Sequence, residues 1–422
     1  MRFRSSATIV GVVLALVGTA FSATAGGSRP GLPPGQTQGI TSNSIKVGGI
    51  AGIENPVNLP YGDIYVGAQA YFDMINAQGG VAGRKINFAV KRNDSSQPTR
   101  DLLQVRALNE EDKVFAIIPV AALYLTGADY TVQHGIPVFG YHVSNDWQKG
   151  PNLFGETGST TCFTCVYPPH AWIARQLGAT KVGVLGYNVQ IAQDCTDWHV
   201  LSLHKYGIKT PYVNKALAFG FTISAFAADV EKIRKSGIQI LTTCQDSNGS
   251  LLAKEAINQG GVNIPVVWGE GYSYDFLQRF GSKLDGLYLS LSEQPFEDPQ
   301  PSVGLKQFMD AMAKGGHSLN KVALAGWENA DLFVTGLKKV GRNLTRQKLI
   351  DAINTTTNWT AHGINSGVNW KVDGHKIVKN GLDCSSYVKV ENGKFVPVFG
   401  KPGHPFVCLK GNAKSLDDVI YK

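Results

Sequence analysis

The stretch IKVGGI at residues 45–50, followed by YGDIYVGAQAYFDMINA at residues 61–77, predicts one strand and one helix of an α/β fold. The first segment is short and apolar, whereas the second repeats apolar residues at helical spacing and ends at Gly79 and Gly80. The same order then repeats, with strands expected at 86–90, 114–118 and 137–139 and helices at 99–109 and 127–133. Such alternation predicts a parallel sheet with helices on both faces.

A segment rich in Gly, Thr and Cys at 155–164 interrupts this alternation, which then restarts. Strands are expected at 181–187, 238–243 and 265–269, and helices at 169–177, 192–206, 223–235 and 250–258. Three more helices, at 301–313, 323–340 and 345–355, cannot bury their apolar faces alone, so we expect them to pack back on an earlier lobe. The fold class is therefore α/β, with two doubly wound, Rossmann-like lobes that are discontinuous in sequence.

Length and composition agree with two folded lobes. The 422 residues exceed what one hydrophobic core usually supports, and 43% hydrophobic with 17% charged residues is ordinary for a folded chain. The net charge is +8, and removal of Arg2 and Arg4 with a cleaved N-terminus leaves +6. Because no run of five like charges occurs, we expect a solvated surface and no nucleic-acid partner.

The N-terminus has the features of a secretory signal peptide over residues 1–25. Arg2 and Arg4 precede a short apolar run at 9–20, and Ala23-Thr24-Ala25 fits the small-x-small cleavage pattern. A membrane anchor is the alternative, but the run is shorter than the roughly 20 residues a bilayer requires. No cysteine precedes Cys162, which argues against a lipid anchor. With a flexible leader at 26–41, the chain is expected to be periplasmic or secreted, without stable membrane insertion.

The six cysteines of an exported chain favour disulfides over metal binding. Spacing alone does not choose among the possible pairings. Cys384 and Cys408 flank a predicted hairpin, 387–390 and 395–399, and hairpin arms bring their outer ends together, so this pair is favoured. Cys162-Phe-Thr-Cys165 has redox CxxC spacing, but it lies in an irregular segment rather than opening a helix after a strand, so a structural role is favoured.

Motifs of catalysis are missing from the sequence. It contains no phosphate-binding P-loop, GxSxG elbow, HExxH helix or GxGxxG sequence opening a helix. The nine histidines are scattered and are expected to be surface or core residues rather than metal ligands. We therefore expect no cofactor, no metal site and no enzymatic activity.

The stretch at 61–70, with INAQGGVAGR at 75–84, resembles the opening of the branched-chain amino-acid-binding proteins of bacterial ABC importers. Gly135-Ile-Pro-Val is similar to the strand that leads to the first-lobe site of that family, and Gly269-Glu-Gly271 to its second-lobe acidic motif. Gly367-Val-Asn-Trp370 with Gly374 resembles a late family element. The resemblance implies a type I periplasmic binding fold, with three hinge crossovers and a ligand held between the lobes. Lobe 1 is then expected at 42–158 plus 290–378, and lobe 2 at 159–289 plus 379–422.

The resemblance also implies site residues. Glu270 matches the glutamate that receives the α-ammonium of the ligand, and Tyr61 matches an aromatic residue that covers its side chain. A solvated loop acid and ordinary packing at a helix start are the respective alternatives. Ser144 is implied for the ligand carboxylate and His142 for a backbone contact, with turn residues as the alternative for both. Further implied contacts are Gln245 and Asp246 on another wall, and Gln190 beside a second-lobe aromatic position.

Two departures put the identity of the ligand in doubt. After the strand at 114–118 the family usually has serines that bind the carboxylate, whereas here residues 119–126 leave Tyr124 or Thr126 for that role. Ile191 stands where the family has tyrosine. Losing a hydroxyl from a site built for hydrogen bonds is a large change. A branched-chain amino acid, or a related small amide or amine, is nevertheless the expected ligand.

The expected function is therefore that of a solute-binding component of an ABC importer, which closes on its ligand as a monomer and docks on permease subunits in the membrane. A ligand-sensing receptor-type protein is the first alternative, and genes for permease and ATPase subunits beside this one would argue against it. An exported hydrolase is the second. It would need a nucleophile and a base, and turnover of a ligand would reveal it.

Overall fold

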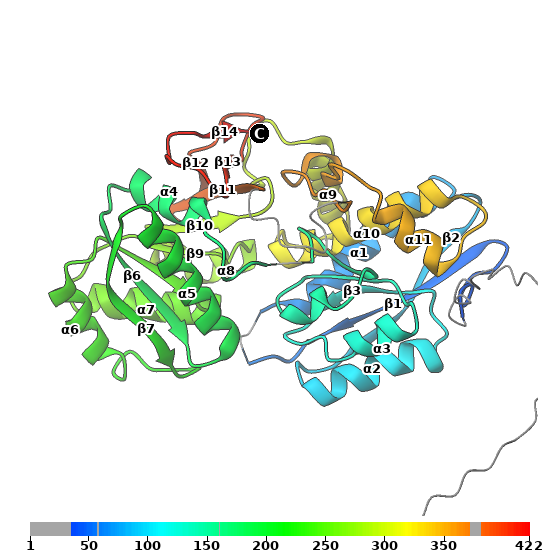
Figure 1. The fold of residues 1–422 in the computed structure, drawn as a ribbon, viewed down its shortest axis with the longest axis horizontal. Coiled ribbons are helices and arrows are strands. Elements are labelled where there is room, and N and C mark those ends of the chain that lie inside the picture. The colour runs from blue at the N-terminus through cyan, green and yellow to red at the C-terminus, as the bar shows by residue number, and fades with distance from the viewer. Residues whose placement is uncertain (1–34, 57–58, 160, 372–380) are drawn as a thin grey trace, which may run out of the picture. The chain divides into compact units, whose positions relative to one another are not determined.

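Two β-sheets organise the chain in the computed structural model, which describes residues 35–56, 59–159, 161–371 and 381–422 (Figure 1). The first sheet is parallel throughout and has the order β2-β1-β3-β4-β5. Its strands are β1 (Ser44–Ala51), β2 (Lys85–Asn93), β3 (Ala116–Ala121), β4 (Val138–Gly140) and β5 (Leu153–Gly155). All six residues of β3 are buried, as expected for a central strand covered on both faces.

Helices from both ends of the chain cover the first sheet. Figure 1 shows α2 (Pro98–Glu110) and α3 (Ala128–Gln133) on one face and α1 (Ile64–Ala77) with α10 (Lys321–Val340) on the other. α10 contacts α1, β3 and β4, while α9 (Val303–Gly315) packs on α1 and α11 (Arg346–Ile353) on α10. The late helices thus pack back on the first lobe, as the sequence predicts.

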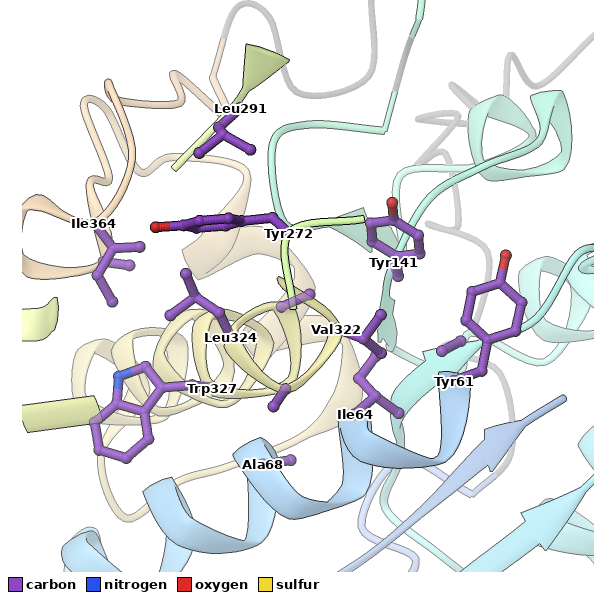
Figure 2. Close-up of a cluster of buried hydrophobic side chains, with 14 of the residues drawn as sticks. Tyr61, Ile64, Ala68, Tyr141, Tyr272, Leu291, Val322, Leu324, Trp327 and Ile364 are labelled. Atoms are coloured by element: carbon purple, nitrogen blue, oxygen red, sulfur yellow. The ribbon is translucent and has the colours of Figure 1, made fainter. Parts of the chain in front are cut away.

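Glycines bring α1 and α10 into close contact. A Cβ atom at Gly67 would lie 1.7 Å from the backbone oxygen of Ala323, and one at Gly326 would lie 2.0 Å from that of Ile64. Figure 2 shows the two helices side by side, with Ala68 and Trp327 among the buried residues of this region. This contact fixes the N-terminus of α10, which matters for the site below.

The second sheet is mixed and has the order β14-β13-β11-β10-β9-β8-β6-β7, with β12 paired to β11. β6 pairs in parallel with β7 and β8, β8 with β9, and β9 with β10. β11 pairs antiparallel with β10, β12 and β13, and β13 with β14. The strands are β6 (Lys181–Tyr187), β7 (Lys209–Leu217), β8 (Ile240–Cys244), β9 (Val266–Trp268), β10 (Leu287–Leu291), β11 (Leu382–Glu391), β12 (Lys394–Val398), β13 (Val407–Lys410) and β14 (Ile420–Tyr421).

Helices also pack on the second sheet. α4 (Pro168–Gln176) packs against α5 (Gln190–Lys205), β11 and β13, whereas α6 (Ala227–Ser236) contacts α7 (Ser247–Gln259) and β7. The short helix α8 (Tyr274–Phe280) follows β9. Single turns of 3-10 helix are η1 (Tyr61–Asp63), η2 (Asn145–Gln148), η3 (Gly281–Leu284) and η4 (Ala361–Gly363). No helix in the described ranges is long and apolar enough to span a bilayer.

The chain passes between the two lobes after β5, after β10 and before β11, so the predicted fold class is confirmed. The third passage includes residues 372–380, outside the described part of the chain. The predicted domain boundaries stay predictions, and the predicted signal peptide lies wholly outside the described residues. The described end of the predicted flexible leader is anchored. The side-chain amide of Gln38 donates to the backbone carbonyl of Asn109 at 2.9 Å. The backbone N–H of Arg346 donates to the backbone carbonyl of Gln36.

Three disulfides are present: Cys162–Cys165, Cys195–Cys244 and Cys384–Cys408. The favoured pair is thus bonded, although the reason differs from the one given above. The predicted hairpin is β11 with β12, but Cys408 lies beyond it on β13, directly opposite Cys384 across the β11–β13 ladder. The Cys195–Cys244 bond ties α5 to the end of β8, next to the candidate residue Gln245.

Candidate functional site

The candidate residues lie in loops that follow parallel strands. Tyr141 comes directly after β4 of the first sheet, and Glu270 follows β9 of the second. The register of β8 and β9 places Gln245 and Glu270 at matching positions beyond the two strand ends. Ligands of open parallel sheets bind beyond the carboxyl ends of the strands, so this is where a site is expected.

Tyr141, Glu270 and Lys321, which we name the cleft cluster, meet across the two lobes. The Tyr141 hydroxyl donates to Oε1 of Glu270 at 2.9 Å, and Nζ of Lys321 lies 3.5 Å from the same oxygen. Lys321 also donates to the carbonyl of Gly269 at 3.1 Å and lies 5.6 Å from the ring centre of Tyr141. Both side-chain contacts of Glu270 involve Oε1, and Oε2 accepts no hydrogen bond from any described residue.

The surroundings of the cleft cluster carry more acid than base. Burial alone would lower the pKa of Lys321, but the carboxylates of Glu270, Glu293 and Glu156 raise it overall, which keeps the ammonium charged. Glu293 is 3% exposed, and burial raises its pKa even though Lys321 and Ser292 act in the opposite direction. The ammonium of Lys321 thus interacts electrostatically with three carboxyl groups, of which Glu270 lies in direct contact with it.

Tyr61 lies beside the cleft cluster. Its side chain is 1% exposed, and its ring centre is 6.3 Å from that of Tyr141. Figure 2 shows the two hydroxyl groups pointing the same way. Burial, followed by the charge of Glu270, raises the pKa of Tyr61, so its hydroxyl stays protonated at neutral pH. Tyr61 therefore lies next to the cleft cluster through its ring contact with Tyr141.

Gln245 has a buried amide without a partner. It is 6% exposed, and neither its Oε1 nor its Nε2 hydrogen-bonds to any described residue. Such groups are rare in proteins and call for a missing partner. Asp246 differs, because its carboxylate caps α7 by accepting from the N–H groups of Asn248 and Gly249 and also accepts from the Tyr187 hydroxyl at 2.5 Å.

His142 and Ser144 already have local partners. The backbone N–H of His142 donates to Oε2 of Glu156 at 3.3 Å, and its Nδ1 lies 3.6 Å from the same oxygen. The Ser144 hydroxyl donates to Asp146 at 3.1 Å. His142 borders a cavity of about 300 Å³ that also contacts Tyr167. Ser144 lies outside the cleft cluster.

The remaining candidates are not brought to the cleft cluster. Tyr124 is 42% exposed. Gln190 is the first residue of α5, and its side-chain amide donates to Asp194, one turn further along the helix, at 2.7 Å. The Thr126 hydroxyl donates to the Pro98 carbonyl and to Asp101. Neither residue expected to replace the missing serines thus contacts Lys321 or Glu270.

Two further cavities border the cleft cluster. One, of about 230 Å³, lies inside the second lobe between α4, α5 and the sheet. The other, of about 190 Å³, is lined by residues around η1, α8 and the N-terminus of α10, including Asp63 and Phe276. Glu270 and Lys321 line both cavities. A ligand held by these two side chains can therefore extend into either space.

One group of side chains has metal-ligand character. The ligand atoms of Cys195, His199 and Cys244 lie within 4.8 Å of one another. The two sulfur atoms, however, are bonded to each other, so they offer no thiolate. In the disulfide form this group cannot serve as a metal site.

Sequence reasoning missed Lys321, Tyr141 and Glu293. Tyr141 follows a predicted strand at 137–139, so a search for polar residues just after predicted strands would have identified it. Lys321 precedes the predicted helix at 323–340, which is far from the other cluster residues in sequence. Only the packing of α10 on α1 brings it to Glu270, and the sequence gives no local signal of that contact.

Two lobes, each with adjacent parallel strands, and a charged cluster beyond the strand ends define the class of two-lobed ligand-binding proteins. A family model described as "Periplasmic binding protein" matches residues 44–389, so the chain belongs to this family. The resemblance seen in the sequence is thereby confirmed. Among curated proteins, none matches the sequence.

Solved structures with the same fold bind different solutes. The branched-chain amino acid transporter substrate binding protein of Streptococcus pneumoniae, in complex with isoleucine, is 18% identical with a TM-score of 0.68, covering 84% of this chain and 98% of its own. A fatty acid ABC transporter substrate-binding protein from Thermomonospora curvata is 17% identical with a TM-score of 0.69, covering 86% and 93%. A solute binding protein from Rhodopseudomonas palustris in complex with p-hydroxybenzoic acid is 18% identical with a TM-score of 0.67, covering 84% and 95%. These likenesses show the fold alone.

Proposed function

We propose that this protein is an extracytoplasmic solute-binding component of an ABC importer that holds a small amino-acid-like ligand between its lobes. The observation that carries the proposal is the cleft cluster, in which Tyr141, Glu270 and Lys321 meet beyond the strand ends of both sheets. Family membership supports a solute-binding role and no chemistry on the ligand. A branched-chain amino acid or a related amide or amine fits this role.

The charges of the cluster suit a zwitterion. Oε2 of Glu270, which has no partner among the described residues, would accept from the ligand ammonium. Nζ of Lys321 would donate to the ligand carboxylate, in the place of the serines that the family has after its third strand. The unpaired amide of Gln245 supplies a further donor and acceptor at the same sheet edge. A carboxylate and an ammonium in one site desolvate at lower cost when a zwitterion pairs with both.

Closure of the lobes is the proposed mechanism. Glu270 comes from the second sheet, whereas Tyr141 and Lys321 come from the first sheet and its helix α10, so a ligand touches all three only when the lobes are together. Binding then shifts the population toward the closed form. Permease subunits in the membrane would recognise that form. The site of action would be the periplasm or the exterior.

Isothermal titration calorimetry tests this proposal with pairs of ligands that differ only in the amine, such as leucine and its deaminated acid. Wild type should prefer the amine. Glu270→Gln keeps the shape but removes the charge, so amino-acid affinity should fall by about tenfold to a hundredfold, and the preference over the deaminated acid should shrink.

Glu231→Gln is the matched control, because Glu231 is an exposed acid on α6 that pairs with Arg234. Exposed pairs contribute little, so this variant should bind like wild type. Equal affinity of wild type and Glu270→Gln, or a wild type that binds the deaminated acid as well as the amino acid, would count against the proposal.

A further inference from the structure

The cavity of about 230 Å³ in the second lobe leads from the cleft cluster into the space between two helices and the sheet. Its walls are formed by α4, the C-terminal half of α5 and the strands β6, β8, β9 and β10. Glu270, Ser292 and Lys321 line it as well, so the charged groups and the interior belong to one continuous space. None of the residues expected from the family resemblance, apart from Glu270, lines this cavity.

The cavity is lined largely by apolar and aromatic side chains, with hydroxyl groups from Thr242, Ser290 and Ser385, and is large enough for a six-membered ring. Ile173, Leu203, Ile240, Val267 and Leu291 provide aliphatic surface from both helices and from the sheet. An apolar protein cavity of about 150 Å³ is large enough to bind benzene. A volume of about 230 Å³ therefore accommodates one aromatic ring with a short linker to a charged head group.

Five aromatic side chains line the cavity: Tyr167, His170, Trp198, His199 and Trp268. The rings of His170 and His199 are stacked with centres 3.6 Å apart, and Trp198 lies edge-on to His170 at 4.6 Å. Tyr167 lies 4.9 Å from Trp198. Edge-to-face and stacked contacts favour a further aromatic ring over an aliphatic chain of similar size.

These walls are uncharged but keep free hydrogen-bonding positions. Burial lowers the pKa of His170 and lowers that of His199 to about 3, so both imidazoles are neutral at neutral pH. Nδ1 of His170 and Nε1 of Trp198 are buried without a hydrogen-bond partner among the described residues. A polar substituent on a ring, such as a hydroxyl, could pair with them, which would remove the cost of leaving them unpaired.

We propose that this cavity receives the aromatic side chain of the ligand, and that the ligand is an aromatic amino acid. The inference rests on the proposed function, since the ammonium and carboxylate are held by Glu270 and Lys321 at the mouth. The ring lies between α4 and α5, under Trp198. No covalent step is involved.

Calorimetry with free amino acids tests the inference on the unmodified protein. Phenylalanine, tyrosine or tryptophan should bind at least about tenfold more tightly than leucine, isoleucine and valine. A tighter aliphatic ligand would overturn the inference and leave the proposed function standing. Absence of binding by every amino acid would overturn both.

Ala174→Leu localises the ring. Ala174 is buried on α4 and lines the cavity, so a leucine there fills part of it. Aromatic affinity should fall by about tenfold or more, while the affinity for valine, whose side chain is short, stays unchanged. Ala313→Leu, at an exposed position of α9, is the control and should bind like wild type.

Trp198→Phe adds a readout that does not depend on filling the cavity. An aromatic ligand beside Trp198 should change the intrinsic fluorescence of wild type, and this change should be reduced in Trp198→Phe. Equal aromatic affinity in Ala174→Leu and wild type, or a fluorescence change that persists in full in Trp198→Phe, would overturn the proposal.

Discussion

Glu270 and Lys321 give the site a character that neither residue would have alone. Lys321 offsets the charge of Glu270 through Oε1 when the two lobes are together, and Oε2 accepts no hydrogen bond from any described residue. The resemblance placed Glu270 at the position of an ammonium acceptor, but it gave no sign of the lysine beside it. A zwitterion that adds one charge of each sign leaves the net charge of the cluster unchanged, whereas a simple amine or a simple acid changes it.

Asp101 makes stability depend on pH. The side chain is fully buried on α2, and Oδ2 accepts from the N–H of Gly127 at 2.9 Å and from the Thr126 hydroxyl at 3.0 Å. Burial raises the pKa of Asp101 from 3.8 to about 7, although these two hydrogen bonds lower it. The folded protein thus binds a proton that the unfolded chain has lost between about pH 4 and pH 7. The stability that this bound proton of Asp101 contributes is lost as the pH rises through that window.

Asp101→Asn keeps an acceptor for Gly127 and Thr126 but cannot ionise. The free energy of unfolding should be measured in urea at pH 5 and at pH 8. From pH 5 to pH 8 it should fall in wild type, and the fall in Asp101→Asn should be smaller by roughly 2–3 kcal/mol. Asp129→Asn, at an acid whose side chain is 67% exposed, should keep the pH dependence of wild type. An identical pH dependence in Asp101→Asn and wild type would contradict the assignment.

Among the elements, most of the buried ones are predicted by the sequence, although the buried strands β5 and β10 were not predicted. β1, β3, β6 and β8 are apolar runs, and long helices such as α10 have a clear helical period. β7 was not predicted, because it is an edge strand of mostly exposed residues with a proline at Pro211. β13 and β14 were also missed, since they are held by the β11 ladder and by Cys408 rather than by a pattern of their own.

For the site, sequence could predict the loops after strands but not the side chains that meet there. Glu270 and Tyr61 lie at or beside the cleft cluster. Tyr124 and Gln190 instead face solvent or a neighbour on their own helix. The sequence could not predict the tertiary contact of α10 with α1, which brings Lys321 to Glu270. This contact depends on two glycines that are 259 residues apart in the sequence, at positions 67 and 326.

The close contact of α1 with α10 predicts that Gly67 does not tolerate a side chain. In Gly67→Ala the new methyl group would meet the backbone oxygen of Ala323 at 1.7 Å, so the helices must move apart. The free energy of unfolding, measured in urea, should fall by roughly 1–3 kcal/mol or more. Gly62→Ala is the matched control. Its nearest neighbour would be a side-chain atom of Ile53 at 3.7 Å, so its stability should stay within about 0.5 kcal/mol of wild type. Equal loss in the two variants would show that the helix contact is not the cause.

At the scale of the whole molecule, the chain passes three times between the lobes, and the proposed ligand site lies between the strand ends of the two sheets. A few crossing segments permit rotation of one lobe relative to the other at low cost. The cleft cluster then couples that rotation to the ligand, because its three side chains come from both lobes. Ligand binding is thus expected to bring the lobes together.

Small-angle X-ray scattering of the mature protein, without ligand and with an amino acid at a concentration that calorimetry shows to be saturating, tests this claim most directly. The radius of gyration should be smaller in the saturated protein and intermediate at half saturation. A scattering curve that does not change on saturation would contradict closure of the lobes on the ligand.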